Sequence, residues 1–171
     1  MILSKKKVLQ LVKQKKIVIT PFIEENLNAA SIDLTLSNEF KKIKKKNKVK
    51  ISEKSFNDSS LFKLIKLKEK ELLELKPGEL VLGRTIEKIS LPDSICGWIQ
   101  GRSRFARLGL IVHVSSSFIQ PGVNNIQVLE IVNLSKNTLL LKPGEKICQV
   151  IFEQATGGSI EKGVFSKQTN V

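Results

Sequence analysis

The residues whose types could carry out chemistry are concentrated between positions 97 and 130. Glu130 is the one acidic residue in an apolar run that covers 128–132. A carboxylate in such a run either points to solvent from one face of a strand or works as a buried group. In the second case it can take a proton from water and return it to a substrate, which is general acid–base catalysis. The residue type alone leaves both readings open.

A second group of polar residues begins at Gly101. Arg102, Ser103 and Arg104 follow it directly, and Arg107 comes about one helical turn later. Main-chain N–H groups after a glycine can face an anion, with help from guanidinium and hydroxyl groups. The residues that follow favour a short helical turn, whose N-terminus attracts phosphate. The string therefore predicts an anion site, although its specificity is low when it is taken alone.

A zinc site of the usual ligand spacing is excluded by the available ligand residues. The chain has one histidine, His113, and two cysteines, Cys96 and Cys148, which form no C-x-x-C pair. We interpret the cysteines as small core residues and His113 as a satisfied core or interface residue. Acid–base chemistry at this site would then depend on a carboxylate such as Glu130.

Composition limits the class of protein and its partners. With 171 residues, 41% of them hydrophobic and 26% charged, the chain suits one globular domain over 1–171. The net charge of +13 indicates either a polyanionic partner or a lysine-rich solubilising surface. Because aromatic residues for base stacking are scarce beside the lysines, we expect no specific nucleic-acid partner. The sequence shows neither a membrane-spanning run nor the order of a signal peptide, which predicts a cytoplasmic location.

The hydrophobic pattern predicts one short helix followed by many strands. Residues 4–16 carry an apolar stripe opposite lysines, as in an amphipathic helix. Residues 29–36 alternate apolar and polar side chains, as in a strand. After residue 60, short strand-like runs are separated by Pro-Gly turns at 77–78, 121–122 and 143–144. This succession predicts a mainly β fold, either a distorted β-barrel or a jelly-roll, with a short N-terminal helix.

Two segments differ from this pattern. Residues 41–60 are rich in lysine and then in serine and asparagine, and we expect an exposed excursion there. Residues 154–171 contain glycines and few apolar side chains, and we expect a mobile C-terminal tail.

Motifs spread over most of the chain have the order and spacing of one known family. In chain order they are Ser31-Ile32-Asp33-Leu34, Asn38-Glu39-Phe40, Gly101-Arg102-Ser103, Ala106-Arg107-Leu108-Gly109-Leu110, Val112-His113-Val114, Ile119, Pro121-Gly122, Leu129-Glu130, Asn133, Lys142-Pro143-Gly144, Ile147, Gln149 and Phe152-Glu153. On these residues the sequence resembles the dCTP deaminase branch of the dUTPase-like superfamily. The match is most specific between residues 97 and 153.

The resemblance implies a dUTPase-like β-barrel or jelly-roll in a homotrimer, with active sites built from neighbouring subunits. It implies hydrolytic deamination of dCTP to dUTP, with the nucleotide bound as its Mg²⁺ complex and no metal ligands from the protein. In that family the glutamate of the Leu-Glu motif is the proton shuttle, which is Glu130 here, while Ser103 and Arg107 support the base and the attacking water. The resemblance also implies substrate contacts, which fall on Arg102, Arg104, Phe105, Ala106, Ser116, Gln120, Val128, Leu129 and Gln168.

Gln120 departs from the family pattern, which usually has Ile-Asp-Pro-Gly. In the dUTPase branch this aspartate contacts the sugar 3′-hydroxyl and positions the water that attacks the triphosphate. An amide can form hydrogen bonds with a hydroxyl but is a poor base. We therefore predict a dCTP deaminase, with a dUTP diphosphatase, alone or combined with deamination, as the alternative. A further alternative is a non-catalytic relative that binds nucleotides or nucleic acid through the basic surface.

Overall fold

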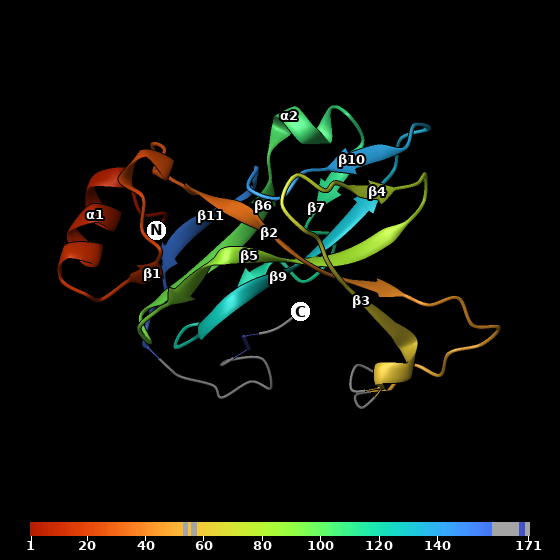
Figure 1. The fold of residues 1–171 in the computed structure, drawn as a ribbon. Helices are drawn as coiled ribbons and strands as arrows, with labels where there is room; N and C mark the ends of the chain where they lie inside the picture. Colours follow the sequence, from red (N-terminus) through yellow and green to blue (C-terminus); the bar gives the residue numbers. More distant parts are fainter. Residues whose placement is uncertain (53–54, 56–57, 159–167, 170–171) are drawn as a thin grey trace.

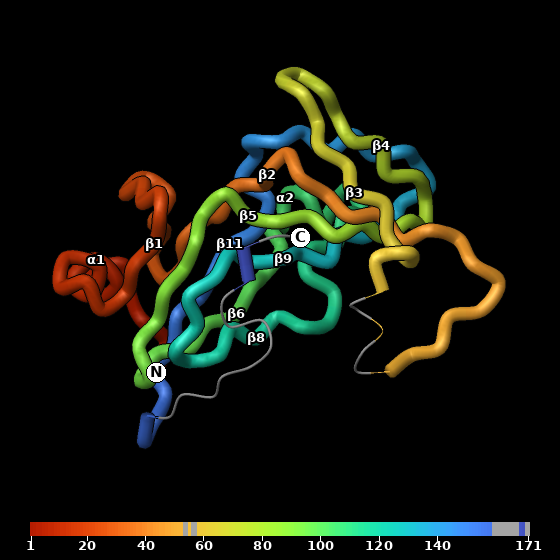
Figure 2. Tube along the Cα trace, turned by 60° about the horizontal axis from the view of Figure 1, so that its bottom comes forward, coloured from red at the N-terminus to blue at the C-terminus, as the bar shows by residue number. Residues whose placement is uncertain are grey.

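The computed structural model describes residues 1–52, 55, 58–158 and 168–169, and its main feature is an antiparallel sheet of nine strands. The strand order is β7-β9-β5-β2-β11-β6-β8, with β1 paired to β5 and β3 paired to β2. Strands β4 and β10 form a separate antiparallel pair. Figures 1 and 2 show that the large sheet curls like half of a barrel, with α1 at one end and α2 at another edge.

The elements have the following bounds. The helices are α1 (Lys5–Lys13) and α2 (Ser103–Ala106), with single 3₁₀ turns η1 (Glu24–Asn26) and η3 (Ser59–Leu61). The strands are β1 (Val18–Thr20), β2 (Ile32–Ile43), β3 (Phe62–Lys66), β4 (Leu73–Leu75), β5 (Leu80–Ser90), β6 (Ile95–Gly101), β7 (Leu110–Val112), β8 (Phe118–Ile119), β9 (Asn124–Asn133), β10 (Leu139–Leu141) and β11 (Lys146–Gln154).

The N-terminal helix is present but shorter than the range 4–16 that its pattern predicted. It begins after Ser4 and buries Val8 and Leu11 against the rest of the chain, as an amphipathic helix does. It ends at Lys13 because the chain turns there: Lys15 has a φ of 56°, which an α-helix cannot contain. The prediction of a mainly β fold with a short N-terminal helix is confirmed.

The three Pro-Gly pairs lie in turns between strands, as predicted. Their glycines, Gly78, Gly122 and Gly144, have φ values of 74°, 77° and 88°. Positive φ at the residue after proline is the requirement of a type II turn, and glycine adopts it without a steric penalty. These turns lead into β5, β9 and β11, three of the longest strands.

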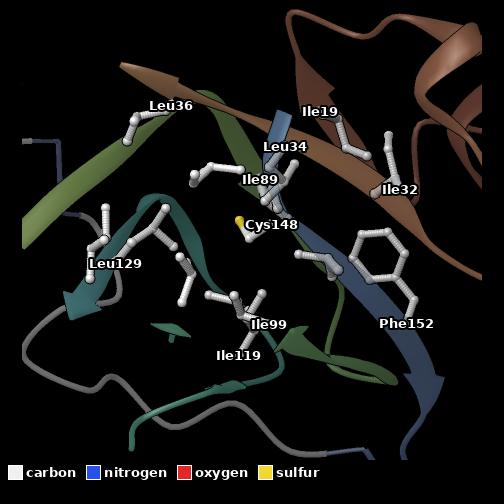
Figure 3. Packing of buried hydrophobic residues seen from close by; sticks show 14 of the residues in the cluster. Ile19, Ile32, Leu34, Leu36, Ile89, Ile99, Ile119, Leu129, Cys148 and Phe152 are labelled. Carbon is white, nitrogen blue, oxygen red and sulfur yellow. The ribbon is translucent and has the colours of Figure 1, made fainter. Parts of the chain in front are cut away.

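The core lies on the inner, concave face of the curled sheet (Figure 3). Side chains from β2, β5, β9 and β11 meet there, among them Leu34, Ile89, Leu129 and Cys148. Cys148 has no exposed surface, and this burial raises the pKa of its thiol. Cys96 is buried as well, so the interpretation of both cysteines as core residues is confirmed. The inner face therefore supplies stability, and groups that meet solvent must project from the outer face or the sheet edges.

The two segments that differ in composition lie beside β2 and beyond β11. Strand β2 continues to Ile43 and pairs with β3, so the first residues of the expected excursion 41–60 belong to a hairpin. Residues 44–52 are exposed, while positions 53–54 and 56–57 lie outside the described residues. Of the expected tail 154–171, positions 159–167 and 170–171 also lie outside them, and its mobility stays a prediction. In the described ranges no helix is long and apolar enough to cross a membrane.

Candidate active site

Glu130 projects from the outer face of β9, opposite the core. Its neighbours Leu129 and Ile131 are fully buried, and the regular alternation of a strand turns Glu130 the other way. The side chain is nevertheless only 24% exposed. The two readings that the sequence left open are thus both incomplete, because Glu130 is on the outer face but is partly covered.

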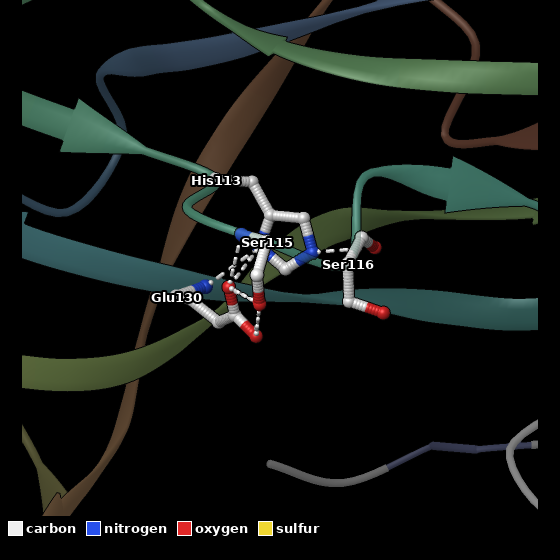
Figure 4. A network of polar contacts seen from close by, with 4 residues as sticks. All are labelled: His113, Ser115, Ser116 and Glu130. Atoms are coloured by element: carbon white, nitrogen blue, oxygen red, sulfur yellow. Dashed lines mark hydrogen bonds and ion pairs between the residues drawn. The ribbon is translucent and has the colours of Figure 1, made fainter.

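The loop that follows β7 covers the Glu130 carboxylate (Figure 4). The backbone N–H of Ser115 donates a hydrogen bond to Glu130 Oε2 at 2.8 Å. The Ser115 hydroxyl lies 3.1 Å from Oε1 and 3.0 Å from Oε2. Hydrogen bonds that an ionised carboxylate accepts are stronger than those between neutral groups. Ser115 therefore fixes the orientation of this carboxylate while a quarter of its surface stays open.

His113 connects the same loop to the backbone of β9. Its Nδ1 accepts the Glu130 N–H at 2.9 Å, and its Nε2 lies 2.8 Å from the carbonyl oxygen of Ser116. Because Nδ1 faces a donor and Nε2 faces an acceptor, the ring must be the neutral tautomer with its proton on Nε2. The 3.9 Å approach of Nδ1 to the Glu130 carboxylate is then not an ion pair. His113 is satisfied, as interpreted from the sequence, and it organises the site.

The predicted partners of Glu130, Ser103 and Arg107, lie on or next to the single-turn helix α2. Both side chains are exposed, as is that of Arg104. Within the part of the chain that the structure describes, no hydrogen bond or ion pair joins these three side chains to any residue, Glu130 included. One subunit therefore does not bring Ser103 and Arg107 to Glu130.

Arg102 differs from the other arginines of this string because it is held inside the subunit. Its Nη2 lies 3.1 Å from Asp33 Oδ2, and its Nη1 donates to the Lys146 carbonyl oxygen at 3.0 Å. Asp33 is buried, with 5% of its surface exposed. A buried carboxylate needs such a partner. This ion pair ties the end of β6 to β2 and β11.

The other predicted substrate contacts lie in different environments. Gln120 and Ser116 are exposed near β8, and Val128 is half-buried on the same face of β9 as Glu130. Leu129 points into the core with no exposed surface, so only its backbone could contact a ligand. Phe105 packs partly against the core, while Ala106 beside it on α2 is exposed. The Gln168 carbonyl accepts the Ile126 N–H at 3.1 Å, which places this tail residue on β9.

Ser115 is the site residue that sequence reasoning missed, since the prediction chose Ser116 instead. A signal was present, because Ser115 and Ser116 both follow directly after the Val112-His113-Val114 motif. The described residues contain no cluster of three or more His, Cys, Asp or Glu side chains that could hold a metal ion.

Comparison with known proteins bears on the family of this chain. The family model for "dCTP deaminase-like" proteins matches residues 2–155, which is most of the chain. The chain belongs to the dCTP deaminase-like family. The resemblance to dCTP deaminases seen in the sequence is thereby confirmed.

Relatives in this family carry two different names. A "dCTP deaminase, dUMP-forming" from Dictyoglomus turgidum is 35% identical over 158 residues, which cover 91% of this chain and 81% of the relative. A "dCTP deaminase" from Wigglesworthia glossinidia brevipalpis is 38% identical over 169 residues, covering 92% and 85%. The fold of 2′-deoxycytidine 5′-triphosphate deaminase from Agrobacterium tumefaciens matches with a TM-score of 0.70 at 17% identity. That match covers 90% of this chain and 48% of the longer solved one.

Proposed function

We propose that this protein deaminates dCTP to dUTP and ammonia without a protein-bound metal, with Glu130 as the proton carrier. The observation that carries the proposal is the geometry of the carboxylate, which Ser115 orients and which stays partly open on the outer face of β9. Relatives of similar length that are named dCTP deaminases support the choice of substrate.

The reaction needs a group that transfers two protons in turn. Water attacks C4 of the cytosine ring, and Glu130 takes the proton that water loses and gives it to N3 of the ring. Glu130 then takes the proton of the new C4 hydroxyl and gives it to the amino nitrogen, so that the bond between C4 and that nitrogen breaks, ammonia leaves and the C4 carbonyl of uracil forms. The donors on Ser115 hold the carboxylate in one orientation through both transfers, so that no reorganisation is needed at the moment of reaction.

We also propose that the protein works as a homotrimer whose active sites are shared between subunits. The support is that Ser103, Arg104 and Arg107 are exposed and have no side-chain partner among the described residues, although their types suit a triphosphate and a developing charge. A neighbouring subunit could place its α2 over Glu130. Mg²⁺ would then enter with the triphosphate, because the described residues offer no carboxylate cluster for it.

Complementation between inactive variants tests the shared site. Glu130→Gln and Arg107→Ala should each abolish ammonia release. When the two are unfolded and refolded together, about a quarter of the sites in a random mixture should combine an intact Glu130 with an intact Arg107 from the neighbour. Recovered activity supports sharing between subunits. A mixture as inactive as its components would place both groups within one chain and contradict the proposal.

The product is a separate question because relatives with both names match. The name "dUMP-forming" of the Dictyoglomus turgidum relative favours a second candidate, deamination followed by diphosphate release. Gln120 argues for dUTP as the final product, since an amide cannot act as a base toward water. Incubation with dCTP and with dUTP, each with Mg²⁺, followed by separation of all products, decides between them. Diphosphate release from dUTP would overturn the assignment to dUTP. A cytoplasmic location stays a prediction.

A further inference from the structure

Arg84 lies on the same face of the sheet as Glu130. In the antiparallel ladder of β5 and β9, Leu82 is opposite Glu130 and Arg84 is opposite Val128. Residues two apart on a strand share one face, so Arg84 and Glu130 both project from the outer face. Diagonal neighbours of this kind lie about 7–8 Å apart. Arg84 is therefore next to the proposed catalytic carboxylate, although no motif drew attention to it.

The edge of β9 leaves one backbone donor available on the same strand as Glu130. Strand β7 pairs with β9 only at Ile131, Val132 and Asn133, so β9 has no strand partner on that side at Ile126 among the described residues. The Gln127 N–H points toward β5 and donates to the Thr85 hydroxyl. The N–H of Ile126 points to the opposite side of the strand and donates to the carbonyl oxygen of Gln168, at 3.1 Å. The open edge of β9 thus provides the first contact point for the C-terminal residues.

Arg84 provides the second contact point. Its Nη2 lies 2.8 Å from Glu39 Oε2, and its Nη1 donates to the carbonyl oxygen of Thr169 at 3.3 Å. Its Nε is buried and has no hydrogen-bond partner in the described part of the chain. Lys66 binds the other oxygen of Glu39 at 2.9 Å and lowers the pKa of Glu39 below the ordinary 4.5, with help from Arg84. Glu39 is thus an ionised anchor that holds the guanidinium toward the tail.

We propose that Arg84 is a positioning residue that docks Gln168 and Thr169 on the outer face of β9, beside Glu130. The inference rests on the proposed function in one respect, because a nucleotide contact of Gln168 is what the resemblance to dCTP deaminases implies. Two neighbouring carbonyl groups are held by two donors from different strands, which fixes the direction of the peptide between them. The Gln168 side chain is then presented to the site at a small cost in conformational entropy when the nucleotide binds.

Hydrogen exchange tests the docking without any reference to turnover. Deuterium uptake by the Ile126 amide should become about tenfold faster in Arg84→Gln than in the unchanged protein, because its acceptor is released. Arg84→Lys should behave in the same way, since one ammonium cannot replace the two arms of the guanidinium. Lys66→Ala is the matched control, because Lys66 also binds Glu39 but does not touch the tail, and its exchange should be unchanged. Equal exchange in Arg84→Gln and the unchanged protein would overturn the proposal.

Kinetics on the same variants test the link to the substrate. Arg84→Gln should raise the KM for dCTP about tenfold with little change in kcat, which is the signature of lost ground-state binding. A chain that ends at Lys167 should show the same rise, and Arg84→Gln in that background should add nothing further. Additive effects would mean that Arg84 acts independently of the tail and would contradict the proposal. If dCTP is not a substrate at all, the exchange experiment still decides the docking.

Discussion

The imidazole of His113 accepts the backbone N–H of Glu130 at 2.9 Å, and this bond links the loop after β7 to the strand that carries the carboxylate. The same ring holds the Ser116 carbonyl through Nε2. Ser115, which donates to the carboxylate, lies in the chain between His113 and Ser116. The loop and the strand therefore form one unit, in which a backbone contact and a side-chain contact support each other.

Loss of the His113 ring should slow catalysis more than it weakens binding. In His113→Leu we expect kcat to fall about 100-fold through displacement of Glu130, with a small change in KM. His113→Asn should recover part of this loss, since its Oδ1 can take the place of Nδ1 but its side chain is too short to reach Ser116. Steady-state ammonia release with dCTP measures both variants. An equal fall in kcat in His113→Leu and His113→Asn would show that the hydrogen bond from the Glu130 backbone does not contribute to catalysis.

Removal of the Ser115 hydroxyl should have a smaller effect in the same direction. Ser115→Ala keeps the N–H that donates to Oε2 but loses the contacts of the hydroxyl with both carboxylate oxygens. We expect kcat to fall about tenfold, as for one hydrogen bond to a charged group. Ser115→Thr keeps the hydroxyl and should stay within about threefold of the unchanged protein. A fully active Ser115→Ala protein would remove the hydroxyl from the mechanism.

Gln120 offers a gain-of-function experiment. Gln120→Asp restores the carboxylate of the family pattern, which in the dUTPase branch positions water against the triphosphate. We expect the variant to form dUMP and diphosphate from dUTP, while its release of ammonia from dCTP continues. Gln120→Asn, which changes length without adding a base, is the control. If neither variant forms dUMP, another residue prevents diphosphate release.

Gly101 should tolerate no side chain. A Cβ built on it would lie 2.4 Å from the carbonyl oxygen of Val112, so β6 or β7 would have to move. We expect Gly101→Ala to lower the melting temperature by about 5–10 °C. Gly97→Ala is the control on the same strand, because its nearest neighbour is the Val150 Cγ1 at 3.1 Å, the end of a side chain. A thermal unfolding scan should show a clearly smaller loss for Gly97→Ala, and the reverse order would contradict the prediction.

Acidification should remove one ion pair that joins β2 to the turn before β5. Glu79 binds Lys42 at 2.8 Å, and this contact, followed by the Lys76 N–H, lowers the pKa of Glu79 below the ordinary 4.5. A carboxyl whose pKa is lower in the folded state stabilises it above the unfolded pKa and loses that effect as the pH falls through the folded value. Glu79→Gln should therefore be less stable at pH 7, by up to about 1 kcal/mol.

The difference in melting temperature between Glu79→Gln and the unchanged protein should close as the pH falls from 7 to 3. Glu69→Gln serves as control, because the Glu69 carboxylate forms no ion pair with any residue that the structure describes. A difference that stays constant over this range would mean that Glu79 acts through packing and not through charge.

The sequence by itself determined the local features of this protein. The Pro-Gly pairs set their turns, the apolar stripe set α1, and the alternation around Glu130 set which residues face the core, because each depends on neighbours within a few positions. The position of Glu130 as the one acidic residue in an apolar run was likewise visible in the sequence alone, as was the family resemblance.

Only the tertiary structure decided which distant groups meet. The register of β7 on β9 brings Ser115 to Glu130. Strand β11 pairs with both β2 and β6, and this arrangement brings Arg102 to Asp33. Strand β7 ends opposite Ile131, and the edge of β9 beyond it is open, so that the Ile126 N–H meets the Gln168 carbonyl. Strand register is set by packing across the whole sheet, and a shift of one residue would turn every one of these side chains to the opposite face. No local pattern contains that information.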